Sequence, residues 1–369
     1  MTSGHRAVSV TPLAPYPLPL IYDAKSCQDP EMREIVVTRH GAPDVMEERD
    51  RPTPDPGPGD VRIRVKSAGV NFADVLARMG LYPDAPPPPF VVGYEVSGYV
   101  DAVGPGPVRH ELGRHVLALT NFGGYADYAI VPADFVWNAP PNLSHNEAAA
   151  IPVTFLTAVV ALHRMANLKS GETVLLHGAG GGVGVAALQL ARLRRAIVIG
   201  TASPSKHNAL RSLGIDHIID PSRTDIEADV ARITNGRGVD VVLDPIGGAH
   251  LEQSYRMLAP LGRLVIYGSQ AFVDGRERND ERVQRVLQQR PRFDPLDLMS
   301  ANKGVFGLNL GHLWKERRYA AAAMEALLTD FASKRLRAVI SKTFPLARAA
   351  DAHAFLQDRA NVGKVVLTV

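Results

Sequence analysis

The sequence is most notable for what it lacks. It has one cysteine, Cys27, among 369 residues, so it can form no disulfide within the chain and no zinc site built from several cysteines. No apolar run approaches the roughly 20 residues of a membrane-spanning helix. The 41 basic and 38 acidic residues leave a net charge of only +3, which gives no reason to expect nucleic acid as a partner. We therefore expect neither a membrane span nor a nucleic-acid partner.

Residues 1–31 are irregular and rich in proline, and they lack the basic start and continuous apolar core of a secretory signal. We interpret them as a mobile tail and expect the protein in the cytoplasm. The length of the chain exceeds what one hydrophobic core usually supports, so two domains are expected.

Two regions with different sequence patterns follow the tail. Up to about residue 139 the chain reads as short strands, such as Val61–Lys66, separated by Gly- and Pro-rich spacers. From about residue 169, continuous apolar strands alternate with amphipathic helices. This second pattern predicts a doubly wound parallel sheet with helices on both faces, which is an α/β fold.

A glycine run, His177-Gly-Ala-Gly-Gly-Gly-Val-Gly184, lies between a predicted strand and a predicted helix. Ala179, Gly181 and Gly184 take the positions of the G-x-G-x-x-G pattern, with alanine in the first. Gly181 would let the pyrophosphate approach the backbone, and Gly184 would let the helix pack on the strand. The helix start at Gly182 and Val183 would face the phosphates. A plain turn is the alternative, but the surrounding strand–helix series favours a dinucleotide site.

The end of the next strand indicates which dinucleotide. An NAD site usually has Asp or Glu about 20 residues further on, yet residues 173–215 contain no acidic residue. This segment offers Thr201, Ser203 as a predicted helix N-cap, and Lys206. We predict that these residues hold the 2′-phosphate of NADPH. In the alternative interpretation, Lys206 is a solvated surface lysine.

Five stretches carry a family resemblance that spans nearly the whole chain after Met32: Gly69–Tyr82, Gly93–Gly98, Val174–Gly184, Gly200–His207 and Asn361–Leu367. They resemble the zinc-free quinone oxidoreductase branch of the medium-chain dehydrogenase/reductase superfamily, which includes zeta-crystallin, and especially its vesicle amine transport type. The glycine run also looks like the enoyl reductase domains of polyketide synthases. The resemblance implies a GroES-like catalytic domain (32–153 and 308–369), an inserted Rossmann NADPH-binding domain (154–307) and a homodimer.

The same resemblance implies roles for single residues. Zinc-dependent relatives have Cys-His where this chain has Asn71-Phe72, and His where it has Tyr94, so no metal is expected. Asn71 and Tyr82 become the candidate catalytic donors to the acceptor carbonyl, and Asn71 also lies near the cofactor. From their positions alone, Asp74 and Arg78 are expected to pair with each other rather than act in catalysis, and His177 to be a satisfied buried histidine rather than a base. Further residues are expected to line the cofactor cleft: Thr157, Gly247, Tyr267, Gly268, Ser269, Phe306, Leu308, Asn361 and Lys364.

Two departures from the family pattern matter. Leu76 replaces a tyrosine of some bacterial quinone reductases, and Pro221 replaces a tyrosine that often assists phosphate binding. The charged segment 270–302 could be a solvated excursion, a lid or a dimer contact. The expected function is zinc-independent, NADPH-dependent reduction of a small-molecule quinone or enone. The alternatives are an NADPH-binding adaptor or structural protein with little turnover, and an enoyl thioester reductase.

Overall fold

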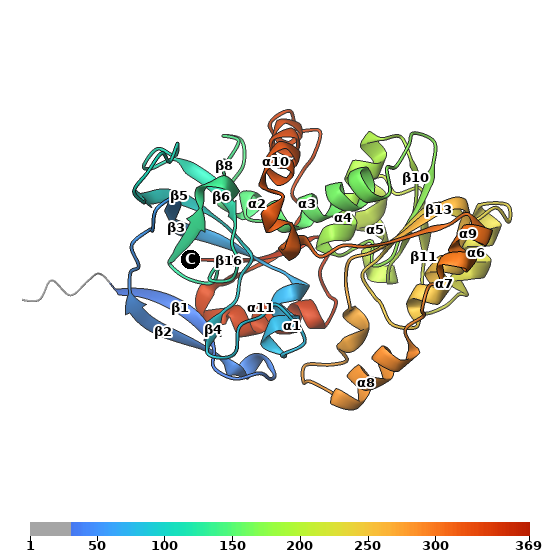
Figure 1. Cartoon of the computed structure of the whole chain (residues 1–369), viewed down its shortest axis with the longest axis horizontal. Coiled ribbons are helices and arrows are strands. Elements are labelled where there is room, and N and C mark those ends of the chain that lie inside the picture. Colours follow the sequence, from blue (N-terminus) through green and yellow to red (C-terminus); the bar gives the residue numbers. More distant parts are fainter. Residues whose placement is uncertain (1–30) are drawn as a thin grey trace, which may run out of the picture.

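The computed structural model describes residues 31–369, in which a β-rich region and a helix-covered parallel sheet lie side by side (Figure 1). Cys27 and nearly all of the expected tail fall outside the described residues. Regular structure begins at Glu31, which pairs with Pro52, so the tail prediction extended one residue too far. The predicted fold class, a doubly wound Rossmann sheet joined to a GroES-like β-rich domain, is confirmed.

The Rossmann region is built on six parallel strands in the order β11-β10-β9-β12-β13-β14. Its central strands are mostly apolar and buried, as a sheet covered on both faces requires: Val174, Leu175 and Leu176 in β9 and Val241, Val242 and Leu243 in β12 are at most 1% exposed. The strands are β9 (Thr173–Leu176), β10 (Ile197–Thr201), β11 (His217–Ile219), β12 (Val239–Asp244), β13 (Leu258–Ile266) and β14 (Gly304–Gly307). The helices are α4 (Gly182–Leu193), α5 (His207–Ser212), α6 (Ile226–Ile233), α7 (His250–Arg256), α8 (Asp280–Gln289) and α9 (Pro295–Ala301).

The order of these strands reverses beside β9, because β10 and β12 flank it on opposite sides. Such a switch point opens a crevice at the carboxyl ends of the strands, where open α/β sheets bind their ligands. The glycine run leaves β9 at this end. The fold therefore places the predicted dinucleotide site at the standard position.

The β-rich region contains a sheet in the order β15-β16-β3-β5-β6-β8, with β7 beside β3, and a small sheet β2-β1-β4. Its C-terminal strand β16 runs antiparallel to β3, so that Val365 faces Val70 and both ends of the chain build one sheet. The strands are β1 (Glu31–Val37), β2 (Met46–Pro52), β3 (Asp60–Val70), β4 (Phe90–Val91), β5 (Glu95–Val103), β6 (His115–Leu119), β7 (Tyr128–Pro132), β8 (Val136–Asn138), β15 (Ile340–Pro345) and β16 (Lys364–Thr368).

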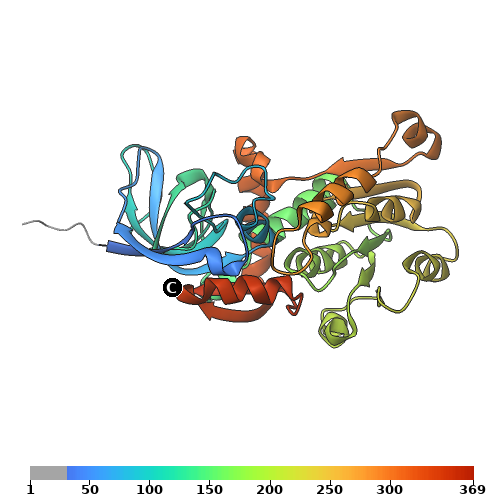
Figure 2. The same ribbon diagram turned by 90° about the horizontal axis from the view of Figure 1, so that it is seen from below.

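Five helices accompany this region: α1 (Phe72–Arg78), α2 (His145–Ala148), α3 (Pro152–Val159), α10 (Arg317–Ala332) and α11 (Ala349–Gln357). Figure 2 shows α11 beneath the β-rich sheet, at the border with the Rossmann region. The helical stretch His145–Met165 is long and apolar enough to cross a membrane, which corrects the expectation that no stretch comes close. In the fold, 78% of its most apolar window is buried inside the protein, as in a core helix.

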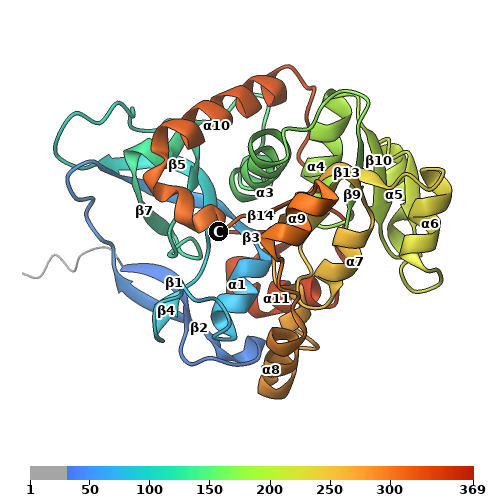
Figure 3. The same ribbon diagram turned by 45° about the vertical axis from the view of Figure 1, so that its right-hand side comes forward.

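The charged segment 270–302 forms α8 and α9, and α8 projects from the body of the molecule (Figure 3). No residue of α8 is buried. The approach to α8 is nevertheless fixed to the β-rich region: Arg278 donates to the carbonyl oxygen of Gly80 at 2.8 Å, and Arg276 pairs with Asp358 at 2.8 Å. The segment thus bridges the two regions beside α1 and α11.

Candidate active site

The glycine run forms a tight turn between β9 and α4. Gly181 occupies the N-cap position of α4, and Gly182 is its first residue. A Cβ atom at Gly184 would lie 2.5 Å from the carbonyl oxygen of Gly178 and 2.8 Å from Ala179, so only glycine fits there. Helix and turn therefore pack as closely as a dinucleotide fingerprint requires. Val183 follows in the first turn, half-buried against the core.

Thr201 connects this turn to the end of β10. Its Oγ1 accepts a hydrogen bond from the backbone N–H of Gly178 at 3.1 Å, and its carbonyl oxygen accepts one from Ala179 at 3.0 Å. The C-terminal segment contacts the same turn, because Gly363 N donates to the carbonyl oxygen of Gly180 at 2.9 Å. Asn361, which donates to the carbonyl oxygen of Gly363 at 2.8 Å, is therefore close to the glycine run, and its contact with the cofactor stays a prediction.

Lys206 lies over the glycine run. A Cβ atom at Gly180 would meet the Lys206 Cδ at 2.6 Å, so the side chain crosses directly above that glycine. Burial and, second, the charge of Arg359 lower the pKa of Lys206. Within residues 31–369, neither Lys206 nor Arg359 has a carboxylate partner among the salt bridges. Two cations thus converge without a counter-charge beside the expected phosphate position, and sequence reasoning missed Arg359.

Ser203 differs in detail from its prediction. It precedes a short 3₁₀ turn, Pro204–Lys206, and α5 begins only at His207. Its hydroxyl group contacts that of Ser205 at 3.2 Å and makes no capping bond. Ser203 and Pro204 thus take the predicted N-cap and first positions, but of a 3₁₀ turn and without a capping bond.

Asn71 lies in a buried polar cluster at the end of β3. Its Nδ2 donates to Glu95 Oε1 at 3.0 Å, and its Oδ1 accepts from the Lys364 ammonium. Lys364 also forms an ion pair with Glu95, whose second oxygen accepts from Val153 N at 2.8 Å. Glu95 is completely buried and Lys364 is 4% exposed. The carboxylate and the ammonium compensate each other, and together they fix the orientation of the Asn71 amide.

Lys364 also reaches toward the cofactor side. A Cβ atom at Gly182 would lie 2.9 Å from Thr154 and 3.8 Å from the Lys364 Cδ. The cluster around Asn71 and the start of α4 are therefore neighbours. Thr157 donates to the carbonyl oxygen of Val153 within α3 at 2.6 Å, and its predicted contact with the cofactor stays a prediction. Thr154 is the threonine beside the glycine run.

Asp74 and Arg78 do not pair with each other, which corrects that prediction. Asp74 is fully buried and accepts from Asn71 N at 2.7 Å, Gly93 N at 2.8 Å and Tyr125 Oη at 3.2 Å. Burial raises the pKa of Asp74 to about 7. Arg78 points elsewhere and donates to Gln357 at 2.8 Å. Backbone N–H groups occupy the carboxyl oxygens of Asp74, and the Arg78 guanidinium group binds a different partner.

Tyr82 lies on the loop after α1 and spans the gap to the later part of the chain. Its hydroxyl group donates to Asn309 Oδ1 at 3.2 Å, and Asn309 in turn donates to Asp84 at 3.1 Å. Tyr94 lies next to Tyr82, with ring centroids 5.8 Å apart. Tyr82 is thus brought to the border between the regions, but its hydroxyl group is already engaged.

The ends of β12 and β13 bring several predicted residues together. A Cβ atom at Gly247 would approach the carbonyl oxygen of Gly268 at 3.3 Å and Ser269 at 3.5 Å. Tyr267 precedes them, and its N–H bonds the carbonyl oxygen of Asp244 at 3.0 Å. Leu308 is buried, but the Phe306 ring is 38% exposed and lies back over Gly304, away from the carboxyl end of β14.

Asp244, which sequence reasoning did not single out, ties these loops together. It accepts from the N–H groups of Ile246 and Gly247 at 2.6 and 3.0 Å, and from His250 and Ser254 at 2.8 and 2.6 Å. Ser254 also contacts His177 at 3.2 Å. His177 is buried and hydrogen-bonded as predicted, and burial and His250 lower its pKa to about 3. His177, Asp244 and His250 are the one group of potential metal ligands in the described chain, and their bonds to each other and to Ser254 account for their grouping.

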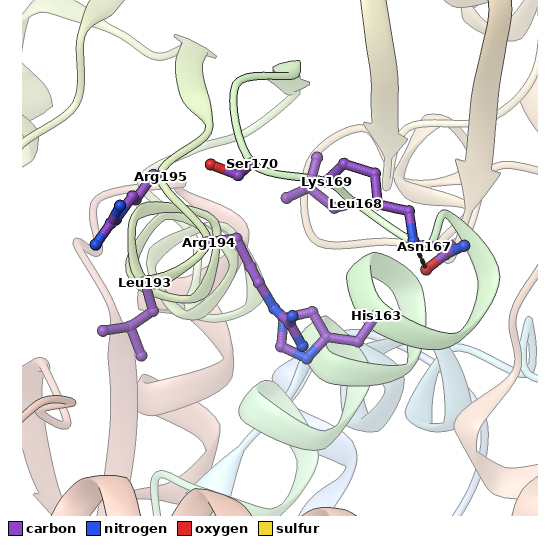
Figure 4. Close-up of a pocket in the computed structure, with 8 residues that line it drawn as sticks. All are labelled: His163, Asn167, Leu168, Lys169, Ser170, Leu193, Arg194 and Arg195. Carbon is purple, nitrogen blue, oxygen red and sulfur yellow. Dashed lines mark hydrogen bonds between the residues drawn. The ribbon is translucent and has the colours of Figure 1, made fainter.

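A separate surface hollow of about 330 Å³ lies at the other end of α4 (Figure 4). It is lined by His163, Lys169, Arg194 and Arg195, among others. Since α4 begins at Gly182 and Arg194 directly follows its last residue, this hollow is a helix length away from the glycine run. It is not part of the candidate active site.

Comparison with known proteins identifies the chain. Residues 57–141 match the alcohol dehydrogenase GroES-like domain, and residues 213–367 match a domain described as zinc-binding dehydrogenase. The human synaptic vesicle membrane protein VAT-1 homolog is 37% identical over 91% of this chain and 86% of its own length. The zebrafish (Danio rerio) homolog is 36% identical over 83% of this chain, which spans 63% of that protein.

Solved structures agree. A mycobacterial protein complexed with NADPH is 31% identical, with a TM-score of 0.81 over 92% of this chain and 100% of that one. A mycobacterial quinone oxidoreductase (30%, TM-score 0.77, 92% and 100%) and the CurK enoyl reductase (31%, TM-score 0.78, 91% and 99%) are similarly close.

The fold and the site define an oxidoreductase of the medium-chain dehydrogenase/reductase superfamily. Within it, the chain belongs to the family of the synaptic vesicle membrane protein VAT-1 homologs.

Proposed function

We propose that this protein is an NADPH-dependent reductase that transfers hydride to a carbonyl-conjugated small molecule such as a quinone or an enone. The observation that carries the proposal is the position of Lys206 across Gly180, near Arg359 and without a carboxylate partner. A half-buried ammonium without a counter-charge, here with an exposed guanidinium nearby, is unfavourable until an anion binds. The 2′-phosphate distinguishes NADPH from NADH and supplies such an anion.

The residues present fit this cofactor. The glycines at 181 and 184 leave the backbone open at the start of α4, where free N–H groups and the helix dipole favour a pyrophosphate. Thr201 fixes the turn, and the segment around Asn361 and Gly363 closes it from the other region. When bound, the nicotinamide supplies the hydride.

On the acceptor side, the chain must orient the substrate and keep out water. The Glu95–Lys364 pair fixes Asn71 at the border with the start of α4. Because Asn71 and Tyr94 stand where zinc-dependent relatives have ligands, we propose that polarisation of the carbonyl relies on hydrogen bonds rather than a metal. The matched domain described as zinc-binding makes zinc content a direct test.

We also propose a homodimer. Leu261, Leu296 and Met299 are 75%, 68% and 68% exposed, and Phe306 on the edge strand β14 is 38% exposed. Leu261 N bonds the carbonyl oxygen of Asn302, just past α9, at 2.7 Å, so this turn adjoins α9. An open sheet edge flanked by exposed apolar side chains is suited to pairing with a second copy.

The experiment is NADPH oxidation by the purified protein with a panel of acceptors: quinones, enones, alkenals and an enoyl thioester. We expect turnover with quinones or enones and little with saturated ketones. The likeness to the CurK enoyl reductase makes the thioester the second candidate, and turnover restricted to it would replace our substrate class. Tight NADPH binding without turnover of any acceptor would indicate a binding protein instead.

A further inference from the structure

The two donors expected to reach the acceptor carbonyl are already engaged. The Tyr82 hydroxyl group donates a hydrogen bond to Asn309 Oδ1, which also accepts one from Gly311 N. The Asn71 Nδ2 lies 3.0 Å from Glu95 Oε1 and 3.3 Å from the carbonyl oxygen of Gly69. Either residue would have to give up a bond within the protein before it could donate to a substrate.

Tyr94 differs from both. Its hydroxyl group is buried and has no hydrogen-bond partner within residues 31–369. An unpartnered buried hydroxyl group destabilises the folded state, and native proteins keep few of them. The backbone of Tyr94 is fixed, because it directly precedes buried Glu95 and its carbonyl oxygen accepts from Thr120 N at 2.9 Å.

The ring that carries this hydroxyl group packs against other aromatic rings. The Tyr94 ring packs against Tyr82 at 5.8 Å and against Phe122 at 5.0 Å. Phe122 has a backbone φ of +71°, a conformation that is costly for a bulky residue. Phe122 also packs edge-on against Phe90 at 5.9 Å. Aromatic rings beside an unpartnered donor suit a planar conjugated molecule with a carbonyl oxygen.

We propose that the Tyr94 hydroxyl group donates the hydrogen bond that holds and polarises the acceptor carbonyl, an inference that rests on the proposed reductase function. As hydride adds to the conjugated carbon, the displaced electron pair moves through the conjugated system onto the carbonyl oxygen. Tyr94 keeps its proton and stabilises that charge through the hydrogen bond, and water then protonates the oxygen. The acceptor gains two electrons, which the cofactor loses.

The electrostatics agree with a donor and not with a base. Burial, and after it the charge of Asp74, raises the pKa of Tyr94 above its ordinary value. The phenol therefore stays protonated at physiological pH. Tyr94 also occupies the position at which zinc-dependent relatives have a histidine. In this protein its hydroxyl group would polarise the carbonyl group, as the metal does in those relatives.

The test is Tyr94→Phe, which removes one oxygen and keeps the ring. Binding of 1,4-naphthoquinone and of naphthalene is measured by titration of the NADP⁺-loaded protein, and quinone reduction is measured with NADPH. We expect naphthoquinone to bind about fivefold more weakly and naphthalene to bind equally well. We expect kcat/KM to fall on the order of 10²-fold, since the lost donor faces developing charge. The melting temperature should stay equal or rise, because an unpartnered hydroxyl group is removed.

Tyr128→Phe on β7 is the matched control, since this half-buried tyrosine packs beside Arg62, and it should change nothing. Equal loss of naphthoquinone and naphthalene binding, or a lower melting temperature with unchanged kcat/KM, would show that Tyr94 only packs, and would overturn the proposal. If the parent protein reduces no acceptor, the reductase function fails. In that case, if the parent binds naphthoquinone more tightly than naphthalene and Tyr94→Phe loses this difference, Tyr94 binds the carbonyl group without a role in reduction.

Discussion

Replacement of Lys206 by alanine separates the two nicotinamide cofactors most sharply. Its side chain crosses Gly180, and burial and, second, the charge of Arg359 lower its pKa. A charge-assisted hydrogen bond to phosphate contributes about 1.5–3 kcal/mol, or roughly ten- to a hundredfold in the dissociation constant. Because Lys206 is only partly buried and Arg359 remains in the variant, we expect the loss to lie near the lower end. NADH, which has no 2′-phosphate, should bind as before.

The assay is calorimetric or fluorescence titration of both cofactors against the parent, Lys206→Ala and Arg359→Ala. Lys169→Ala is the control, because it removes the same charge from the hollow at the far end of α4. The parent should bind NADPH at least tenfold more tightly than NADH, and added salt should narrow that gap. Equal affinities in the parent would refute NADPH selectivity. A gap that survives in Lys206→Ala would refute the role of this lysine.

Three further predictions follow from the described contacts. The pKa of Asp74 is raised to about 7, so between pH 4 and 7 the folded protein keeps the Asp74 proton while the unfolded chain loses it. As the pH rises through this range, the parent should therefore lose stability relative to Asp74→Asn, by up to about 1.4 kcal/mol per pH unit. A stability difference in denaturant unfolding that does not change with pH would contradict the burial of an ionisable Asp74. If the proposed homodimer forms through α9 and β14, Met299→Glu should yield a monomer in light scattering. A dimer with unchanged mass in this variant would exclude that face as the interface. Metal analysis should find no stoichiometric zinc, and activity should survive chelators; bound zinc that is required for turnover would end the metal-free mechanism.

The features that sequence reasoning predicted well are local. The glycine run between a strand and a helix, the missing acidic residue after β10 and the change of texture near residue 169 each depend on neighbouring residues, and the fold class followed from them. The Asn71 cluster could not be derived in this way, because its bonds join residues 24 and 293 positions apart. That Glu95 is a buried charge compensated by Lys364 is visible only once β16 lies beside β3.

Other predictions were wrong because a side chain bound a different partner from the one that its local spacing suggested. The i, i+4 spacing of Asp74 and Arg78 suggested an ion pair, yet backbone N–H groups of Asn71 and Gly93 bind the carboxyl group first. The Ser203-Pro204 pattern suggested a capped helix, but the serine hydroxyl group contacts Ser205. Tyr82 and Tyr94 were both visible in the sequence, and only their partners show which hydroxyl group is free.

The most direct test of hydride transfer is a single-turnover experiment with NADPH carrying deuterium at the transferred position of C4. The protein is mixed with this cofactor and with an enone, and the product is analysed by mass spectrometry. If the protein is a reductase of this class, NADPH fluorescence should decay only when protein and acceptor are both present, and the decay should be slower with deuterium. The reduced product should carry one deuterium on carbon. Bound NADPH that persists unchanged beside every acceptor, or a product without deuterium, would contradict hydride transfer.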